Sequence, residues 1–199
     1  MFSMKSKKLN SKDYITLGIY SAISFVIMLI AGITNLSPYT YLLYPITYAL
    51  FNGVIYLYIV TKIPKKGAIV LMNIIPVLYL AITGVQGIIS ALSILIFAVI
   101  AELITGNDRK NRRKILISYL IFTAWASCGG EYRFFLFPEG YFAEALESGL
   151  DPAYVDALRS FLDFRWWIGT ILATVIASFL GIKIGEVIVK KHLKKAGVL

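Results

Sequence analysis

The chain has 199 residues, of which 58% are apolar and 16% are charged, and its formal net charge is +9. A soluble domain carries about a quarter of its residues as charged side chains, so this composition excludes an ordinary water-soluble protein. The bases lie in short clusters between apolar runs, which is the positive-inside pattern of membrane proteins and not a nucleic-acid-binding face.

The chain has a single cysteine, Cys128, and a single histidine, His192. One cysteine cannot form an intrachain disulfide or a Cys-based zinc cluster. A lone histidine in a basic tail cannot build a His-paired metal site or a Ser-His relay. There is also no Gly-x-x-x-x-Gly-Lys-Ser/Thr phosphate loop. We therefore expect no enzyme activity, no bound metal and no cofactor in this chain.

The first apolar run, 14–33, follows a basic N-terminal stretch and is long enough to cross a bilayer. It is too long for the apolar region of a signal peptide and lacks a small-residue cleavage pattern. A short turn at 35–38 leads into a second predicted span, 39–60. This span opens with Tyr39, Tyr41 and Tyr44, which suit an aromatic belt at the outer membrane interface.

The segment from Gly67 to Thr105 is almost continuously apolar and has basic clusters on both sides. The positive-inside rule places both of its ends in the cytoplasm, so the segment must cross the membrane an even number of times. We expect two spans, 68–83 and 87–105, joined by an outer turn at the glycine-containing stretch 83–87. Pro76 is expected to kink the first of the two.

The fifth predicted span, 115–137, runs outward, and the sixth, 164–189, returns. Between them lies an acidic segment, 138–163, in which Asp151-Pro152 is a helix start. Apolar residues at helical spacing follow Pro152, so two short amphipathic helices are expected on the outer membrane surface.

The distribution of charge sets the predicted topology. All lysines and arginines except Arg133, Arg159 and Arg165 fall on the proposed inner side. The predicted fold is an all-α integral membrane protein in which residues 1–199 form one domain. It is a six-helix bundle with both termini in the cytoplasm and short external amphipathic helices between spans five and six.

The stretch from Trp125 to Pro138 contains the strongest site candidates. It is apolar until Gly129-Gly130, which offers backbone freedom, and an acid and a base, Glu131 and Arg133, come next. Ionisable groups within a membrane often face a cavity and mark a binding path, although near a membrane surface they also extend into the headgroup layer. Both interpretations remain open at this point.

The candidate substrate-binding residues are aromatic or polar and lie near the predicted outer ends of the spans. They are Trp125, Glu131, Tyr132, Arg133, Arg165, Trp166 and Trp167, with Gln86 and Asn35 in the outer turns. Aromatic walls with a few polar groups suit a small heterocyclic or zwitterionic ligand. The alternative for the adjacent tryptophans is an interfacial belt.

Small residues recur at four-residue spacing in the sixth span, at Gly169, Ala173, Ala177, Gly181 and Gly185. Such a stripe lets another helix approach closely, either within the bundle or from a partner. The first span has a shorter version, Gly18 and Ala22. Glu102, at the inner end of the fourth span, is expected to pair with inner-loop bases or to contact a partner subunit.

The whole chain resembles the S components of energy-coupling-factor (ECF) transporters, and more narrowly the Trep_Strep (MptD-like) group. The segments that carry the resemblance are Asp13-Tyr-Ile-Thr-Leu-Gly-Ile19, Lys62-Ile-Pro-Lys-Lys-Gly-Ala68, Ala98-Val-Ile-Ala-Glu-Leu-Ile104, Cys128-Gly-Gly130, 141–157 and Lys190-Lys-His-Leu-Lys-Lys-Ala-Gly197.

The resemblance implies a subunit of the bacterial cytoplasmic membrane that captures a small micronutrient from outside. A transmembrane coupling protein and two ATPase subunits would then drive its release inside. In the better-known S components small residues of the first span form the docking surface, which implies docking through Gly18 and Ala22 here. The resemblance does not identify the ligand.

Two other classes of function remain open from the residues alone. One is a structural or assembly membrane protein, which needs no ligand pocket. The other is an intramembrane enzyme, for which only Glu102 and Glu131 are candidate catalytic acids, and these are predicted to lie at opposite membrane faces. A ligand-sized cavity opening outward between the external segment and spans five and six would favour the S component.

Overall fold

The computed structural model describes residues 8–195, apart from the side chains of 128–130 and 190–195. The expectations for the N-terminal bases before Lys8 and for the side chains of Cys128 and His192 lie outside the described residues. The helices are α1 (Ser11–Gly32), α2 (Tyr44–Lys62), α3 (Ala68–Leu71), α4 (Ile74–Ala81), α5 (Gly84–Thr105), α6 (Arg112–Ala124), α7 (Tyr132–Leu136), α8 (Pro138–Glu147), α9 (Pro152–Arg159) and α10 (Phe164–Lys195). Two 3-10 segments, η1 (Ile33–Leu36) and η2 (Pro38–Leu43), join α1 to α2, and a π-helical segment, η3 (Trp125–Gly130), joins α6 to α7. The predicted all-helical class is confirmed for the described chain, which contains no strand.

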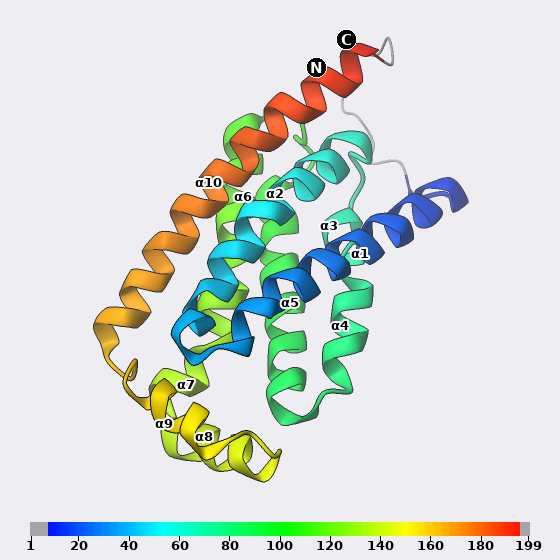
Figure 1. The fold of residues 1–199 in the computed structure, drawn as a ribbon. Coiled ribbons are helices and arrows are strands. Elements are labelled where there is room, and N and C mark those ends of the chain that lie inside the picture. The colour runs from blue at the N-terminus through cyan, green and yellow to red at the C-terminus, as the bar shows by residue number, and fades with distance from the viewer. Residues whose placement is uncertain (1–7, 196–199) are drawn as a thin grey trace.

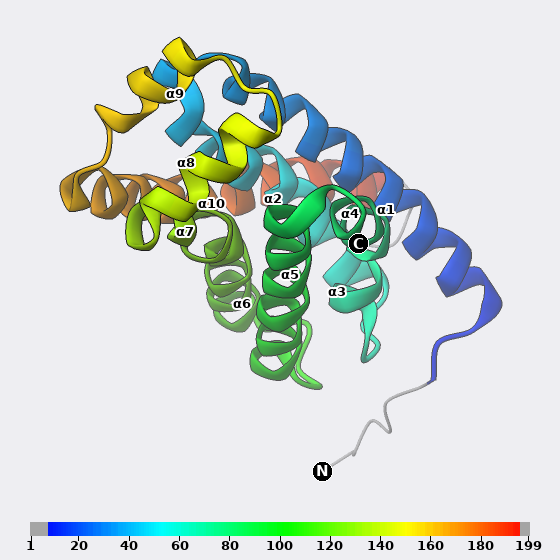
Figure 2. The ribbon, with the colours of Figure 1, turned by 90° about the horizontal axis from the view of Figure 1, so that it is seen from below.

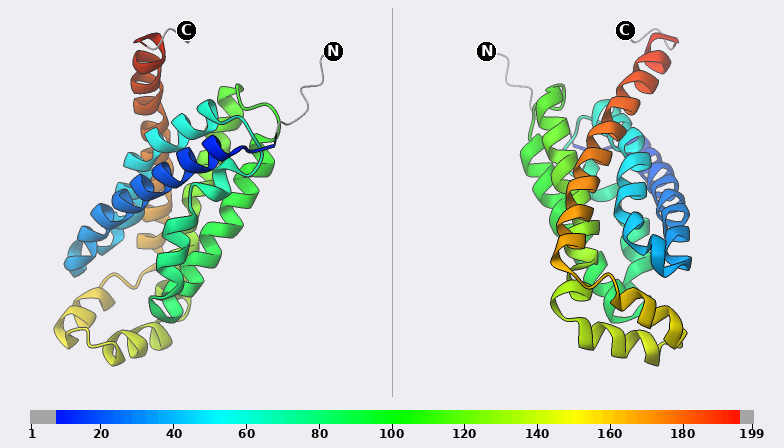
Figure 3. Two further views of the ribbon diagram at one scale, coloured as in Figure 1. Left: turned by 90° about the vertical axis from the view of Figure 1, so that its right-hand side faces the viewer. Right: turned by 60° about the vertical axis from the view of Figure 1, so that its left-hand side comes forward.

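The helices form an elongated bundle with two distinct ends (Figure 1). Helix α10 packs mainly along α2, α5 lies between α4 and α6, and α1 crosses α2 and α4. The α2–α3 and α5–α6 connections lie at one end, which we call the basic end because it carries the clusters at 62–66 and 109–114. The α4–α5 turn and helices α7–α9 lie at the other end (Figures 2 and 3).

Four helical segments of the described chain are long and apolar enough to cross a membrane. They are Ser11–Leu36, Pro38–Lys62, Gly84–Thr105 and Phe164–Val189. The two remaining predicted spans, 68–83 and 115–137, are broken helices: the first divides into α3 and α4, and the second changes from α6 into η3 and α7. The four long segments support a multi-pass membrane protein.

The break between α3 and α4 is a local consequence of Pro76. Proline has no N–H, so it cannot donate to the carbonyl of Met72 four residues earlier, and the helix is interrupted at 72–73. At the start of α4 the Ile75 N–H donates to Ser21 Oγ of α1 at 3.0 Å. A serine of one helix thus satisfies a backbone donor that the interruption leaves free.

The turn between α4 and α5 lies where the glycine-rich stretch predicted it. Helix α4 ends at Ala81 and α5 begins at Gly84, whose φ of 87° is a conformation that favours glycine. Helix α5 therefore starts three residues earlier than the predicted 87–105 span. Gln86 and Ser90, one helical turn apart, come to lie in the first turns of this helix.

The small-residue stripe of α10 forms a backbone contact with α2 over part of its length. A Cβ placed on Gly181 would lie 2.6 Å from the Leu50 carbonyl oxygen, and one on Gly53 would lie 2.5 Å from the Gly181 carbonyl carbon. A Cβ on Gly169 would have no described atom within 4 Å. The stripe is therefore a packing surface near Gly181, whereas its first member lies in open space.

Candidate functional site

A cavity of about 370 Å³ lies at the end of the bundle opposite the basic end. Its walls come from α1, η1, η2, the start of α2, the end of α4, the start of α5, and the segment around η3. The lining residues are Met28, Leu29, Gly32, Asn35, Tyr41, Tyr44, Tyr79, Leu80, Gln86, Ser90, Trp125, Ala126 and Glu131. This volume is at the low end of the range of about 300–1,000 Å³ typical of small-molecule pockets.

Glu131 is the only charged residue among the described residues that line the cavity. It is 4% exposed, and neither carboxylate oxygen has a hydrogen-bond partner among the described residues. Unpartnered polar groups at such burial are uncommon because leaving water without a new partner costs free energy. The buried carboxyl group is therefore the feature of the cavity that most strongly indicates a bound ligand.

The π-helical segment η3 places Glu131 at the cavity. It covers Trp125–Gly130, the stretch in which the two glycines were expected to give the backbone freedom. A π-turn holds one residue more than an α-turn, so it rotates the residues after it by about 100° relative to a continuous α-helix. The first residue of the segment, Trp125, and the residue that follows it, Glu131, both line the cavity, whereas Arg133 of α7 does not.

Two tyrosines of α2 hold Trp125. The rings of Tyr44 and Tyr48 meet the indole edge to face, with centroid distances of 6.3 and 5.4 Å. Tyr48 is itself fixed, because Asn52 Nδ2 donates to its hydroxyl at 3.0 Å, and Ser24 Oγ of α1 donates to Asn52 Oδ1 at 3.0 Å. This chain of contacts joins α1, α2 and η3 next to the cavity.

Arg133 does not line the cavity and is bound to Glu144 and Gln86. Its Nη1 lies 2.7 Å from Glu144 Oε2 of α8 and 3.4 Å from Gln86 Oε1 of α5. Gln86 lines the cavity but Arg133 and Glu144 do not. This base, which contacts the lining residue Gln86, is therefore paired with a carboxylate other than Glu131.

The segment 138–163 is tied to two cavity residues by tyrosines. The hydroxyls of Tyr141 in α8 and Tyr41 are 2.7 Å apart, and the Tyr154 hydroxyl of α9 donates to the Asn35 carbonyl at 2.5 Å. Burial raises the pKa of both Tyr141 and Tyr154, so these hydroxyls stay protonated. Apolar contacts around Phe134 and three buried residues of α8 and α9 complete this attachment: Phe142, Val155 and Leu158.

Four of the nine predicted binding residues line this cavity: Asn35, Gln86, Trp125 and Glu131. The other five do not, Arg133 included. Tyr132 packs edge to face on Phe137 with a centroid distance of 6.2 Å, and Arg165 pairs with Asp163 at 3.5 Å.

The two tryptophans at the start of α10 also lie away from the cavity. Trp166 is 50% exposed and packs on Phe161, whereas Trp167 stacks on Phe135 and donates from Nε1 to the Ser127 carbonyl at 2.8 Å. Helix α10 packs against α2, α6 and η3, but none of its residues is among those that line the cavity. The cavity thus differs in place from the one expected between the external segment and spans five and six.

Three tyrosines and a serine that the sequence analysis did not select also line the cavity. Tyr41 and Tyr44 were expected in an aromatic belt, and Tyr79 and Ser90 lie within apolar runs. Of the three tyrosines assigned to the belt, Tyr39 alone is strongly exposed, at 73%. The hydroxyl groups within apolar sequence were a usable signal, because burying one without a partner is unfavourable.

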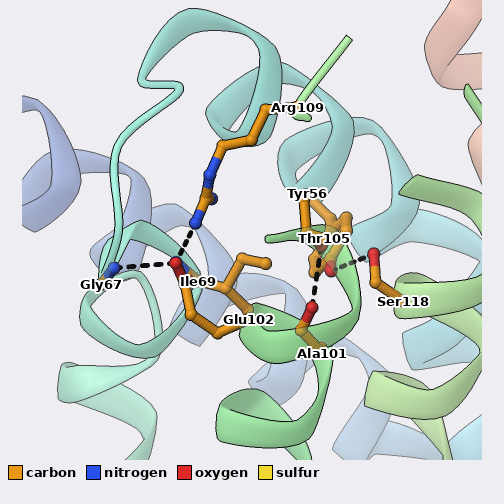
Figure 4. Close-up of polar contacts among 8 residues, drawn as sticks. All are labelled: Tyr56, Gly67, Ile69, Ala101, Glu102, Thr105, Arg109 and Ser118. Carbon is orange, nitrogen blue, oxygen red and sulfur yellow. Dashed lines mark hydrogen bonds and ion pairs between the residues drawn. The ribbon is translucent and has the colours of Figure 1, made fainter. Parts of the chain in front are cut away.

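At the basic end, Glu102 has internal partners (Figure 4). Its carboxylate accepts hydrogen bonds from the N–H groups of Gly67 and Ile69, at 2.8 and 3.0 Å, and pairs with Arg109. Arg109 is only 2% exposed, and burial lowers the pKa of its guanidinium. The predicted pairing with an inner-loop base is therefore present, and it joins α5 to the α2–α3 connection.

Of the three residues predicted to contact a partner, Gly18 and Ala22 lie on an open part of α1. A Cβ on Gly18 would have no described atom within 4 Å, and Ala22 is exposed. Neighbouring apolar side chains on the same helix are exposed too, namely Ile15, Ile19, Ile23 and Val26. Gly18 therefore has room for a side chain among the described residues, and Ala22 is accessible.

Comparison with known families places the chain in a membrane-protein family. A family model described as "Hypothetical bacterial integral membrane protein (Trep_Strep)" matches residues 11–195, which includes every helix described above. No curated protein and no solved structure matches the chain. In the described residues, no group of three or more His, Cys, Asp or Glu side chains could hold a metal ion.

Proposed function

The chain belongs to the Trep_Strep family of bacterial integral membrane proteins, and from this premise we propose that it is the substrate-capture (S) subunit of an ECF-type importer. It takes a small micronutrient from outside the bacterial cytoplasmic membrane. A separate module, made of a transmembrane coupling protein and two ATPase subunits, then drives release of the micronutrient inside.

The observation that carries the proposal is the cavity with its buried carboxylate. A purely structural membrane protein gains nothing from a Glu131 side chain that is 4% exposed, has no partner among the described residues and lies beside four aromatic rings. Such a group is costly in the empty protein and useful once a ligand pairs with it. A cavity with few polar groups and aromatic walls is the usual form of a small-molecule site.

The positions of the basic clusters support uptake from outside. In the proposed topology the basic end faces the cytoplasm, because lysine and arginine in short loops are retained there. The cavity lies at the opposite end and so faces outward. The broken helices 68–81 and 112–136 complete six crossings, since interrupted helices are tolerated in a membrane where protein covers their free backbone groups.

The open face of α1 supports dependence on a partner. Gly18 has room for a side chain and Ala22 is exposed. Small residues at four-residue spacing let another membrane helix approach closely. The sequence contains no phosphate-binding loop of the Walker type, so the proposal requires the ATPase to be on another chain.

The proposal is tested by co-purification from the native bacterium. The tagged chain should recover a second membrane protein and subunits with phosphate-binding loops, identified by mass spectrometry. Gly18→Leu and Ala22→Leu should each reduce this recovery severalfold, because a leucine holds the approaching helix away. Gly169→Leu makes the same change at an open position of α10 and should leave recovery unchanged.

Two results would contradict the proposal. Recovery of the chain in mild detergent without any ATPase subunit would contradict its assignment to an importer. Equal loss of partners in the Gly18→Leu and Gly169→Leu variants would show that bulk on any open face disturbs the complex, and docking through α1 would be lost.

A further inference from the structure

We infer that the cavity binds a small organic cation: a protonated amine or ammonium group carried on an aromatic or apolar body. The inference rests on the proposed function for the premise that a ligand enters the cavity from outside. It goes beyond that function in giving the sign of the ligand's charge, which the fold alone leaves open.

The first argument is the balance of charge. Glu131 is the only charged group among the described lining residues, and its carboxylate has no described partner. Arg133, two residues after Glu131, is already paired with Glu144 at 2.7 Å. An anionic ligand would find no positive partner among the described lining residues, whereas a cation supplies the counter-charge that Glu131 lacks.

The second argument is the nature of the walls. Four aromatic side chains line the cavity: Tyr41, Tyr44, Tyr79 and Trp125. Their ring faces are negative and attract a desolvated cation, and tryptophan does so most strongly. Aromatic walls with one carboxylate select an organic ammonium group rather than a bare metal ion, which requires several oxygen ligands.

The third argument is that the walls are held in place. Trp125 is fixed by Tyr44 and Tyr48, and Tyr41 is held by its hydroxyl contact with Tyr141 at 2.7 Å. A rigid cage loses little conformational freedom when a ligand enters. The cation therefore meets an arrangement that already exists in the empty protein.

The test uses three probes of similar size that differ in charge. Benzylammonium, benzyl alcohol and benzoate are titrated into the purified protein at pH 7, and dissociation constants are taken from the thermal stabilisation each produces. Because a hydrogen bond to a charged group is stronger than a neutral one, benzylammonium should bind at least roughly 10-fold more tightly than benzyl alcohol, and benzoate should bind least. Equal affinities, or a preference for benzoate, would overturn the inference on the wild-type protein alone.

Glu131→Gln keeps the shape of the side chain and removes its charge. The preference for benzylammonium should fall to within about 3-fold, while benzyl alcohol binds as before and reports an intact cavity. Glu147→Gln makes the same change on the exposed end of α8 and should keep the full preference. Glu131→Asp retains the charge and should keep the preference as well. A preference that survives Glu131→Gln would place the cation elsewhere.

The outcome is independent of the importer partners, because the titration uses the purified chain alone. Cation preference without recovery of an ATPase would leave this site standing and refute the proposed importer. Recovery of the importer subunits without cation preference would do the reverse.

Discussion

Replacing two glycines of α10 by alanine should change the free energy of unfolding in opposite directions, because only one of them packs on the backbone of α2. Gly181→Ala adds a Cβ that would lie 2.6 Å from the Leu50 carbonyl oxygen and 2.8 Å from that of Ala49. The closer distance is about 0.8 Å short of ordinary van der Waals contact, which begins at 3.4 Å. Both neighbours are backbone atoms inside a helix, so neither can rotate away, and the two helices must separate.

The expected magnitude results from two opposing effects. Overpacking of a well-packed interior costs about 1–3 kcal/mol, and contact with rigid backbone favours the upper end of that range. Alanine is better than glycine in a helix by about 1 kcal/mol. Gly181→Ala should therefore lower the free energy of unfolding by about 2 kcal/mol, roughly 30-fold in the ratio of folded to unfolded protein. Gly169→Ala, which meets no described atom, should raise it by up to about 1 kcal/mol.

The assay is reversible denaturant unfolding of the purified variants in one detergent. Gly53→Ala should also destabilise, because its Cβ would lie 2.5 Å from the Gly181 carbonyl carbon. The variant with both changes should lose less free energy of unfolding than the sum of the losses of the two single variants, because both changes separate the same pair of helices. The reasoning is refuted if Gly181→Ala is as stable as the wild type, or if it and Gly169→Ala shift stability in the same direction.

The remaining predictions concern the basic end and the topology. Glu102→Gln should lower the free energy of unfolding by about 3 kcal/mol, because it leaves the buried Arg109 without its counter-charge, whereas Glu186→Gln, which breaks an exposed pair, should change it by less than about 1 kcal/mol. Equal effects in denaturant unfolding would show that burial of the pair is unimportant. In a background without Cys128, a cysteine at Ser148 should react with an impermeant label from outside the cell and one at Ser6 only after permeabilisation. Labelling of Ser6 but not Ser148 in intact cells would reverse the proposed orientation.

Much of the local structure could be predicted from single residues. The turn between α4 and α5 is explained by Gly84, the start of α9 by Asp151-Pro152, and the interruption of the third apolar run by Pro76. The unusual backbone at Gly129-Gly130 was also predicted, although its form, a π-helical segment, was not. These features depend on the chemistry of one or two residues and need no knowledge of the residues that pack against them.

The site was predicted only in part, because the solvent around the helices is lipid and not water. In water, the apolar face of a helix is the buried face, whereas in a membrane lipid-facing and core-facing residues are both apolar. In α5, Leu92 and Ile96 are exposed while Ile94 and Ala98 are buried, and composition does not separate the two pairs. The same ambiguity left Tyr41 and Tyr44 assigned to an interfacial belt, although both line the cavity.

By itself, then, the sequence determined the helical class, the membrane as solvent and the clustering of bases at one end, because these depend on composition and on charge along the chain. The pairing of Glu102 with an inner-loop base was predicted, but only the tertiary structure decided the other partners of the ionisable groups. Arg133 pairs with Glu144, eleven residues away, and Glu102 caps a segment that begins at Gly67, whereas Glu131 has no described partner in the cavity. Pairing depends on distances between helices that are far apart in the chain, and a linear pattern of residues does not contain those distances.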